Sequence, residues 1–187
     1  MKTIWLLLII IAAMCCLCPA QSEKGDPPTA SARVQAIKEG SGTLFCNISV
    51  QKLQWKKTEP IEVAVVIENR SESELNVPVV PSFTLKPVAA ADEPASSELS
   101  YLAFWDLRKG TTLPLSTTVP LQLKRGDSKS ITSDIADLLW SRINWSVLPH
   151  SKLFAVVPPG GYSLHLELVG NDGKMLCSSN VVDVLIK

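Results

Sequence analysis

The sequence predicts an all-β protein, a two-sheet antiparallel sandwich with one short helix. Short runs of apolar residues alternate with polar ones, and turn-forming residues interrupt the chain at short intervals. The only helical periodicity covers two turns, and the chain contains no internal repeat. About seven to nine strands can be counted, a number that suits two packed sheets.

The first predicted strands lie between residues 44 and 80. In the run 44–55, alternate residues are apolar, namely Leu44, Cys46, Ile48 and Val50. This parity is typical of a strand with one buried face. Ile61–Ile67 is the strongest strand of the sequence, and the polar turn 68–74 separates it from a short strand at 75–80.

The middle of the chain is less regular. Strands are expected at Phe83–Val88, Leu99–Leu107, Val119–Leu123 and Ser128–Thr132. The one helix is expected at Ser133–Trp140, because Ile135, Leu138 and Leu139 share a helical face. Ser133 or Asp134 would cap its first turn.

The C-terminal part returns to alternation. The turn 158–161 leads into the strand Tyr162–Leu168, the turn 171–173 has hairpin composition, and Met175–Ile186 closes the domain. Two long excursions, 89–118 and 141–157, interrupt the strands. Loops of this length in a compact domain are often functional or disordered.

The N-terminus predicts export. Lys2 precedes an apolar run that ends at Cys18, and a small residue follows at Ala20. We interpret 1–20 as a signal peptide, 21–30 as a flexible leader and 31–187 as the immunoglobulin-like β-sandwich. The protein would then be secreted or periplasmic, with no membrane attachment after cleavage. The alternative is that the apolar run stays as a membrane anchor, for which it is short.

Two of the five cysteines, Cys46 and Cys177, lie beyond the signal. In an oxidising compartment a lone pair far apart in sequence usually forms a disulfide. The alternative is two separate buried thiols. A metal site is disfavoured, because only His150 and His165 could join the cysteines and no short ligand spacing occurs.

Composition argues against several functions. The formal net charge is +0, with no basic stripe for nucleic acid. No catalytic residues can be assigned, because neither histidine lies near a nucleophile motif and no glycine-rich phosphate loop precedes a helix. We therefore expect a protein that is not an enzyme and has no cofactor.

Three segments carry a resemblance, namely 65–71 (VVIENRS), 123–130 (LKRGDSKS) and 158–164 (PPGGYSL). In this order they resemble bacterial extracytoplasmic immunoglobulin-like domains, among them the family of the intracellular proteinase inhibitor of bacilli. The resemblance covers about residues 55–187 and implies a sandwich fold. It suggests protease inhibition as one special case of protein binding. Tyr162 resembles the corner tyrosine of such sandwiches.

The aromatic residues of the two excursions are the candidate binding residues. Trp145 and Phe154 are predicted as ligand-binding positions, whereas Trp105 and Trp140 are expected in the core. The leading hypothesis is a module that contacts another protein through loops or an edge strand. The alternative is a carbohydrate-binding module with exposed tryptophans. If the host has a eukaryotic secretory pathway, Asn69 is the best of three sequons for a glycan, because it lies in a polar turn; the alternative is that the sequons are accidental.

Overall fold

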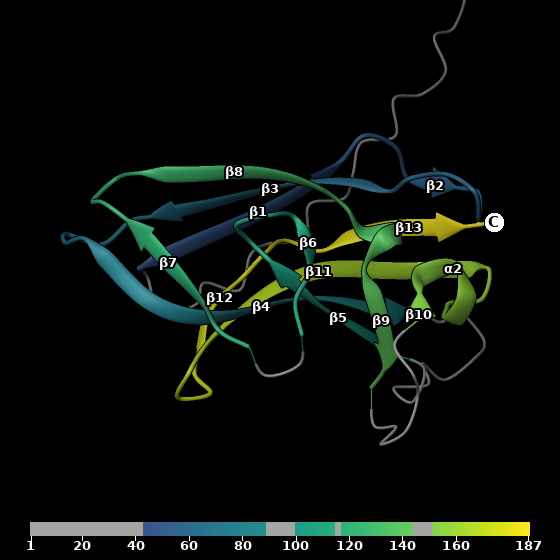
Figure 1. Cartoon of the computed structure of the whole chain (residues 1–187). Coiled ribbons are helices and arrows are strands. Elements are labelled where there is room, and N and C mark those ends of the chain that lie inside the picture. The colour runs from purple at the N-terminus through teal and green to yellow at the C-terminus, as the bar shows by residue number, and fades with distance from the viewer. Residues whose placement is uncertain (1–42, 89–99, 115–116, 144–150) are drawn as a thin grey trace, which may run out of the picture. The chain divides into compact units, whose positions relative to one another are not determined.

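A computed structural model describes residues 43–88, 100–114, 117–143 and 151–187. The described part is an immunoglobulin-like antiparallel β-sandwich, which confirms the predicted fold class (Figure 1). The predicted signal peptide and leader fall outside the described residues. Neither of the two short helices in the described part has the length or apolar character needed to cross a membrane.

The smaller sheet has three strands in the order β1 (Leu44–Val50), β3 (Glu62–Asn69) and β8 (Ser128–Asp134). Both neighbours of β3 run antiparallel to it, with unbroken registers. The central strand β3 alternates between buried and partly buried residues, and Val63, Val65 and Ile67 face the core. This alternation is the period-2 pattern that the sequence shows.

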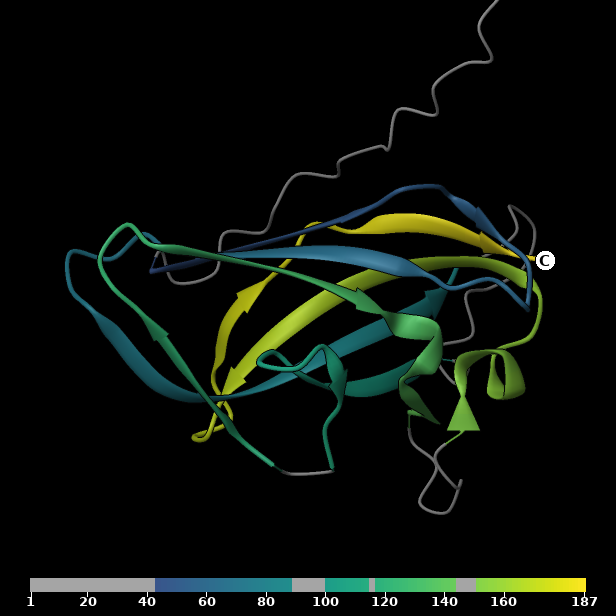
Figure 2. The same ribbon diagram turned by 45° about the horizontal axis from the view of Figure 1, so that its top comes forward.

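The larger sheet is built around β4 (Leu75–Pro87) and β11 (Gly160–Gly170), which pair over their length. The other strands flank these two, and Figure 2 shows this layer packed against the smaller sheet. They are β5 (Tyr101–Asp106), β6 (Thr111–Thr112), β7 (Val119–Leu123), β9 (Leu139–Arg142), β10 (Ser151–Lys152), β12 (Met175–Ser178), β13 (Val182–Ile186) and β2 (Gln54–Trp55).

The core lies between the sheets. Its largest fully buried side chains include Trp105, Trp140 and Phe83, so the core position expected for the two tryptophans is confirmed. The rings of Phe83 and Trp105 lie 5.2 Å apart at a tilted angle. The Cys46–Cys177 disulfide, predicted from the cysteine count, joins β1 to β12 and so ties one sheet to the other.

The helix expected at Ser133–Trp140 is wrong in extent. β8 continues to Asp134, a single 3-10 turn covers Ile135–Asp137, and β9 begins at Leu139. Asp134 caps the turn as expected, because its carboxylate accepts a hydrogen bond from the backbone N–H of Ala136 at 2.9 Å. The single α-helix of the described part is instead α2 (Leu153–Val156), within the second excursion.

Tyr162 forms the corner contact that the resemblance suggests. Its hydroxyl donates a hydrogen bond of 2.8 Å to the carbonyl of Pro158, four residues upstream. The ring is buried and meets Tyr101 edge-on at 6.3 Å. Burial, with a smaller contribution from Tyr101, raises the pKa of Tyr162 to about 12.

The raised pKa predicts a loss of stability at high pH. An unfolded tyrosine ionises near pH 10, whereas the folded phenol stays protonated to about 12. The contribution of the protonated Tyr162 phenol to the free energy of unfolding is therefore complete below pH 10 and is lost as the pH rises toward 12. The free energy of unfolding should fall more steeply over this range in the wild type than in Tyr162→Phe. Equal slopes for the two proteins would contradict this assignment.

Candidate interaction surface

The outer edge of β1 is closed by a side chain. The amide of Asn180 accepts a hydrogen bond from the Ile48 N–H at 2.7 Å and donates one to the Ile48 carbonyl at 2.9 Å. Asn180 thus occupies the place of a neighbouring strand. The Cys46–Cys177 disulfide lies two residues away and holds the same edge against β12. An extended peptide cannot pair with β1 at Ile48.

The outer edge of β7 is interrupted by proline. Pro120 lies directly opposite Pro78 in the ladder between β7 and β4. Because proline has no N–H, this pair occupies a position where the ladder forms no hydrogen bonds. The missing N–H of Pro120 then belongs to the outer edge, which is where sheets tolerate proline. This edge lacks a donor in its middle.

The outer edge of β8 has neither kind of protection. The strand contains no proline, and its register with β3 is continuous from Glu62 opposite Asp134 to Glu68 opposite Ser128. Beyond both ends of the ladder, odd-numbered residues bond toward β3: Asn69 N–H donates to Asp127 O at 2.9 Å and Ile135 N–H to Ile61 O at 3.0 Å. By alternation, the even-numbered residues direct their backbone groups outward.

The open stretch of this edge is short. Its even-numbered side chains, Ser128, Ser130 and Thr132, are exposed. Near Thr132 the chain is covered, because Gly110 packs against the Thr132 carbonyl and its own carbonyl accepts a 2.6 Å hydrogen bond from the Ser133 hydroxyl. We call residues 128–131 the open β8 edge. The two-residue strands β2, β6 and β10 offer less backbone than this.

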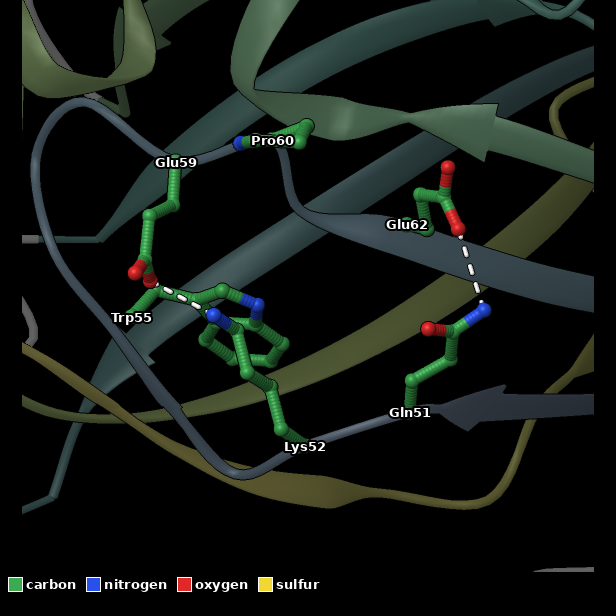
Figure 3. A pocket seen from close by; sticks show the side chains of 6 residues that line it. All are labelled: Gln51, Lys52, Trp55, Glu59, Pro60 and Glu62. Atoms are coloured by element: carbon green, nitrogen blue, oxygen red, sulfur yellow. Dashed lines mark hydrogen bonds and ion pairs between the residues drawn. The ribbon is translucent and has the colours of Figure 1, made fainter.

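A polar hollow of about 430 Å³ lies where the chain passes from β1 to β3. Figure 3 shows its six side chains, with Lys52 directed toward Glu59 and Gln51 toward Glu62. The Lys52 ammonium contacts Glu59 at 2.6 Å, and the Gln51 amide donates to Glu62 at 3.0 Å. The hydrogen bond from Lys52 is the main reason that the pKa of Glu59 is lowered.

The polar groups of this hollow are therefore already paired with one another. Its aromatic member, Trp55, is 2% exposed, so the ring offers no stacking surface. A ligand would have to break the Lys52–Glu59 contact without gaining an aromatic platform. This hollow is therefore not a candidate binding site.

Phe154 lies beside a second hollow of about 400 Å³, between the 57–60 turn and α2. The side chain is partly buried against the core. Asp137 and Lys152 line the same hollow and form an ion pair at 2.5 Å, which raises the pKa of Lys152. Phe154 thus lies at an accessible position, but no other aromatic residue among the described ones lines this hollow. Trp145 lies outside the described residues.

The described tryptophans do not form a sugar platform. Trp55, Trp105 and Trp140 are 2%, 0% and 0% exposed. The indole N–H of Trp140 donates to the carbonyl of Ile135 at 2.8 Å. The carbohydrate alternative thus depends on Trp145.

His165 lies on the face of β11 opposite to the core residues and is buried, with 7% of its surface exposed. Its Nε2 atom is 3.1 Å from Oε1 of Glu167. The hydrogen bond to His165 lowers the pKa of Glu167. Neither of the two hollows described above is lined by a histidine.

Asn69, the best of the three sequons by sequence, is not accessible for a glycan. The side chain is 0% exposed, and its amide donates to the carbonyls of Ser73, Leu123 and Lys124 at 2.9–3.0 Å. Its oxygen accepts from the backbone N–H and the hydroxyl of Ser71. Asn69 joins the turn after β3 to the turn after β7, so a glycan on this nitrogen is incompatible with the fold.

Several solved structures match this chain at low sequence identity. No family model matches the sequence, and no curated protein matches it. Among solved structures, the alkylpurine DNA glycosylase AlkC of Pseudomonas fluorescens is 12% identical, with a TM-score of 0.42, over 78% of this chain and 31% of that one. A CARDB domain from Pyrococcus furiosus is 11% identical, with a TM-score of 0.37, over 77% and 87%.

The sporulation control protein Spo0M of Bacillus subtilis is 8% identical, with a TM-score of 0.39, over 78% of this chain and 50% of that one. The chain thus spans about a third of the glycosylase and half of Spo0M.

Proposed function

We propose that this protein is an exported, non-catalytic binding module that pairs an extended segment of another protein with the open β8 edge. The observation that carries the proposal is the contrast between edges. Asn180 occupies the edge of β1 and Pro120 interrupts that of β7, whereas β8 presents unprotected backbone groups. An unprotected edge is a template for strand addition.

Two observations support export. The Cys46–Cys177 disulfide is of a kind that persists in oxidising compartments. The N-terminal sequence has the composition of a signal peptide. Secretion or a periplasmic location follows as part of the proposal.

The non-catalytic part rests on the chemistry of the site. The open β8 edge carries hydroxyls, one lysine and an isoleucine, and no carboxylate or imidazole that could act as a base. Inhibition of a protease is a special case of the same binding mode. It is supported by the sequence resemblance to the bacillar inhibitor family, and measured protease inhibition would identify it.

Substitution of Ser130 tests the binding mode. Ser130→Pro removes an outward N–H while leaving the hydrogen bonds to β3 intact, so the fold should persist. Ser130→Ala keeps that N–H and is the matched control. In affinity capture from the extracytoplasmic extract of the source organism, read by mass spectrometry, the main partner of the wild type should be retained by Ser130→Ala and lost by Ser130→Pro.

The fold of each variant is checked by its thermal unfolding curve. Equal capture of the partner by a folded Ser130→Pro variant would show that the open β8 edge is not the binding surface.

A further inference from the structure

Basic side chains surround the open β8 edge. Lys129 lies within it, Lys124 and Arg125 lie in the turn before it, and Lys109 precedes the glycine that packs against Thr132. In the described part of the chain, Lys109, Lys124 and Lys129 make no ion pair. Arg125 pairs with Glu72 at 2.6 Å, an exposed contact that water screens.

Most acidic groups near this edge are engaged. Glu68, directly opposite Ser128, pairs with Arg70 at 3.0 Å, and Glu72 pairs with Arg125. The Asp134 carboxylate accepts from Ile61 N–H at 2.8 Å and from Ala136 N–H at 2.9 Å, whereas Asp127 is exposed in the turn. Among the charges beside residues 128–131 that make no ion pair in the described part, Lys124 and Lys129 therefore outnumber Asp127, although the formal net charge of the whole chain is +0. A positive field favours an acidic partner.

Lys129 determines what can lie beside β8. It is opposite Ile67, a fully buried residue of β3, so its side chain emerges on the inner face of the edge strand. A strand added to β8 would place one side chain directly beside Lys129, about 5 Å away between Cβ atoms. A carboxylate at that position is attracted to the ammonium, and another lysine is repelled.

The same lysine opposes pairing between two copies of this chain. Outward backbone groups belong to even-numbered residues, so the antiparallel self-pair that uses both Ser128 and Ser130 aligns Ser128 with Ser130 of the other copy. That register places Lys129 against Lys129, and like charges directly opposite are destabilising. An inward-pointing charge on an edge strand is a known device against self-association.

We infer that the open β8 edge selects an extended acidic segment, with a carboxylate opposite Lys129, and rejects a second copy of this chain. This inference rests on the proposed function and adds the chemistry of the partner.

Three blocked seven-residue peptides test the inference. Each alternates Thr and Val, and the central residue is Glu, Gln or Lys. They are titrated into the purified ¹⁵N-labelled protein, and binding is read from the shifts of the Ser128 and Ser130 amides. The Glu peptide should bind about fivefold more tightly than the Gln peptide, as one favourable cross-strand charge pair allows. The Lys peptide should bind least, and about 0.5 M salt should reduce the differences.

Two sets of variants complete the test. Lys129→Gln should remove the preference for Glu, and Ser130→Pro should abolish binding of all three peptides. Lys129 is partly buried, so a second set of variants at exposed positions is needed. Lys109→Gln and Lys124→Gln should each reduce the preference for the Glu peptide. Lys174→Gln, in the turn between β11 and β12, is the control and should change nothing.

Equal affinities for the Glu and Gln peptides, with binding still sensitive to Ser130→Pro, would overturn this inference and leave the proposed function standing. Failure of all three peptides to bind would also overturn it, and partner capture by Ser130→Pro and Ser130→Ala would then decide the proposed function separately.

Discussion

Removal of the disulfide by Cys46→Ala with Cys177→Ala should lower the free energy of unfolding by about 4–5 kcal/mol. The two cysteines are 131 residues apart in sequence, so the bond restricts most of the unfolded chain. In the loop-entropy model, closing a loop of this length stabilises the fold by that amount. The bond also joins the two sheets beside the Asn180 contact.

Urea unfolding measures this difference. The double variant should reach its midpoint at a much lower urea concentration than the wild type, and Ser49→Ala, an exposed substitution on the same strand, should not. The same shift should follow reduction of the wild type. A difference below about 1 kcal/mol would contradict the entropic role assigned to this bond.

Asn69→Ala should cost about 2–4 kcal/mol, the second largest effect. The side chain makes five hydrogen bonds at a fully buried position, and two of its acceptors are the last residue of β7, Leu123, and the first residue after it, Lys124. Truncation leaves buried backbone groups without partners, and the cost of each is about 1–3 kcal/mol before water re-enters.

Two further variants sharpen this prediction. Asn69→Asp should be at least as destabilising as Asn69→Ala, because a carboxylate oxygen would face the carbonyls that now accept from the amide. Asn76→Ala, at an exposed position of β4, is the matched control and should stay within about 0.5 kcal/mol of the wild type. A stable Asn69→Ala protein would show that the two turns are held by other contacts.

The strands were predictable from the sequence because side-chain alternation is a local property. Ile61–Ile67 and Tyr162–Leu168 are strands at nearly the predicted positions, because each presents one apolar face to the core. The runs 75–80 and 83–88 were separate predictions that the structure joins into one strand. β4 continues through Pro81, which the alternation alone does not allow for.

The predicted helix at 133–140 does not form, because strand pairing with β3 outweighs the local helical periodicity. Pairing of Ser133 and Asp134 with Val63 and Glu62 extends β8 through the first expected helical residues. Only three residues of helical conformation remain before β9 begins. Helical spacing over two turns is too weak a preference to resist such pairing.

The sequence predicts the type of the candidate surface but not its location. An edge strand was among the expected binding surfaces, but which edge is open depends on contacts between residues far apart in sequence. Asn180 closes β1 from 132 residues away, and Pro120 matters only because Pro78 lies opposite it. The burial of Asn69 could not be predicted for the same reason, since its acceptors at Leu123 and Lys124 are 54 and 55 residues distant in sequence.

Amide hydrogen exchange on the complex with the captured partner is the most direct test of the binding mode. The outward amides of Ser128 and Ser130 should exchange quickly in the free protein and slowly in the complex, while the β3-bonded amide of Ile131 should be protected in both. Protection that appears instead around the hollows at 51–62 or at Phe154, with Ser128 and Ser130 still exchanging quickly, would contradict strand addition at β8.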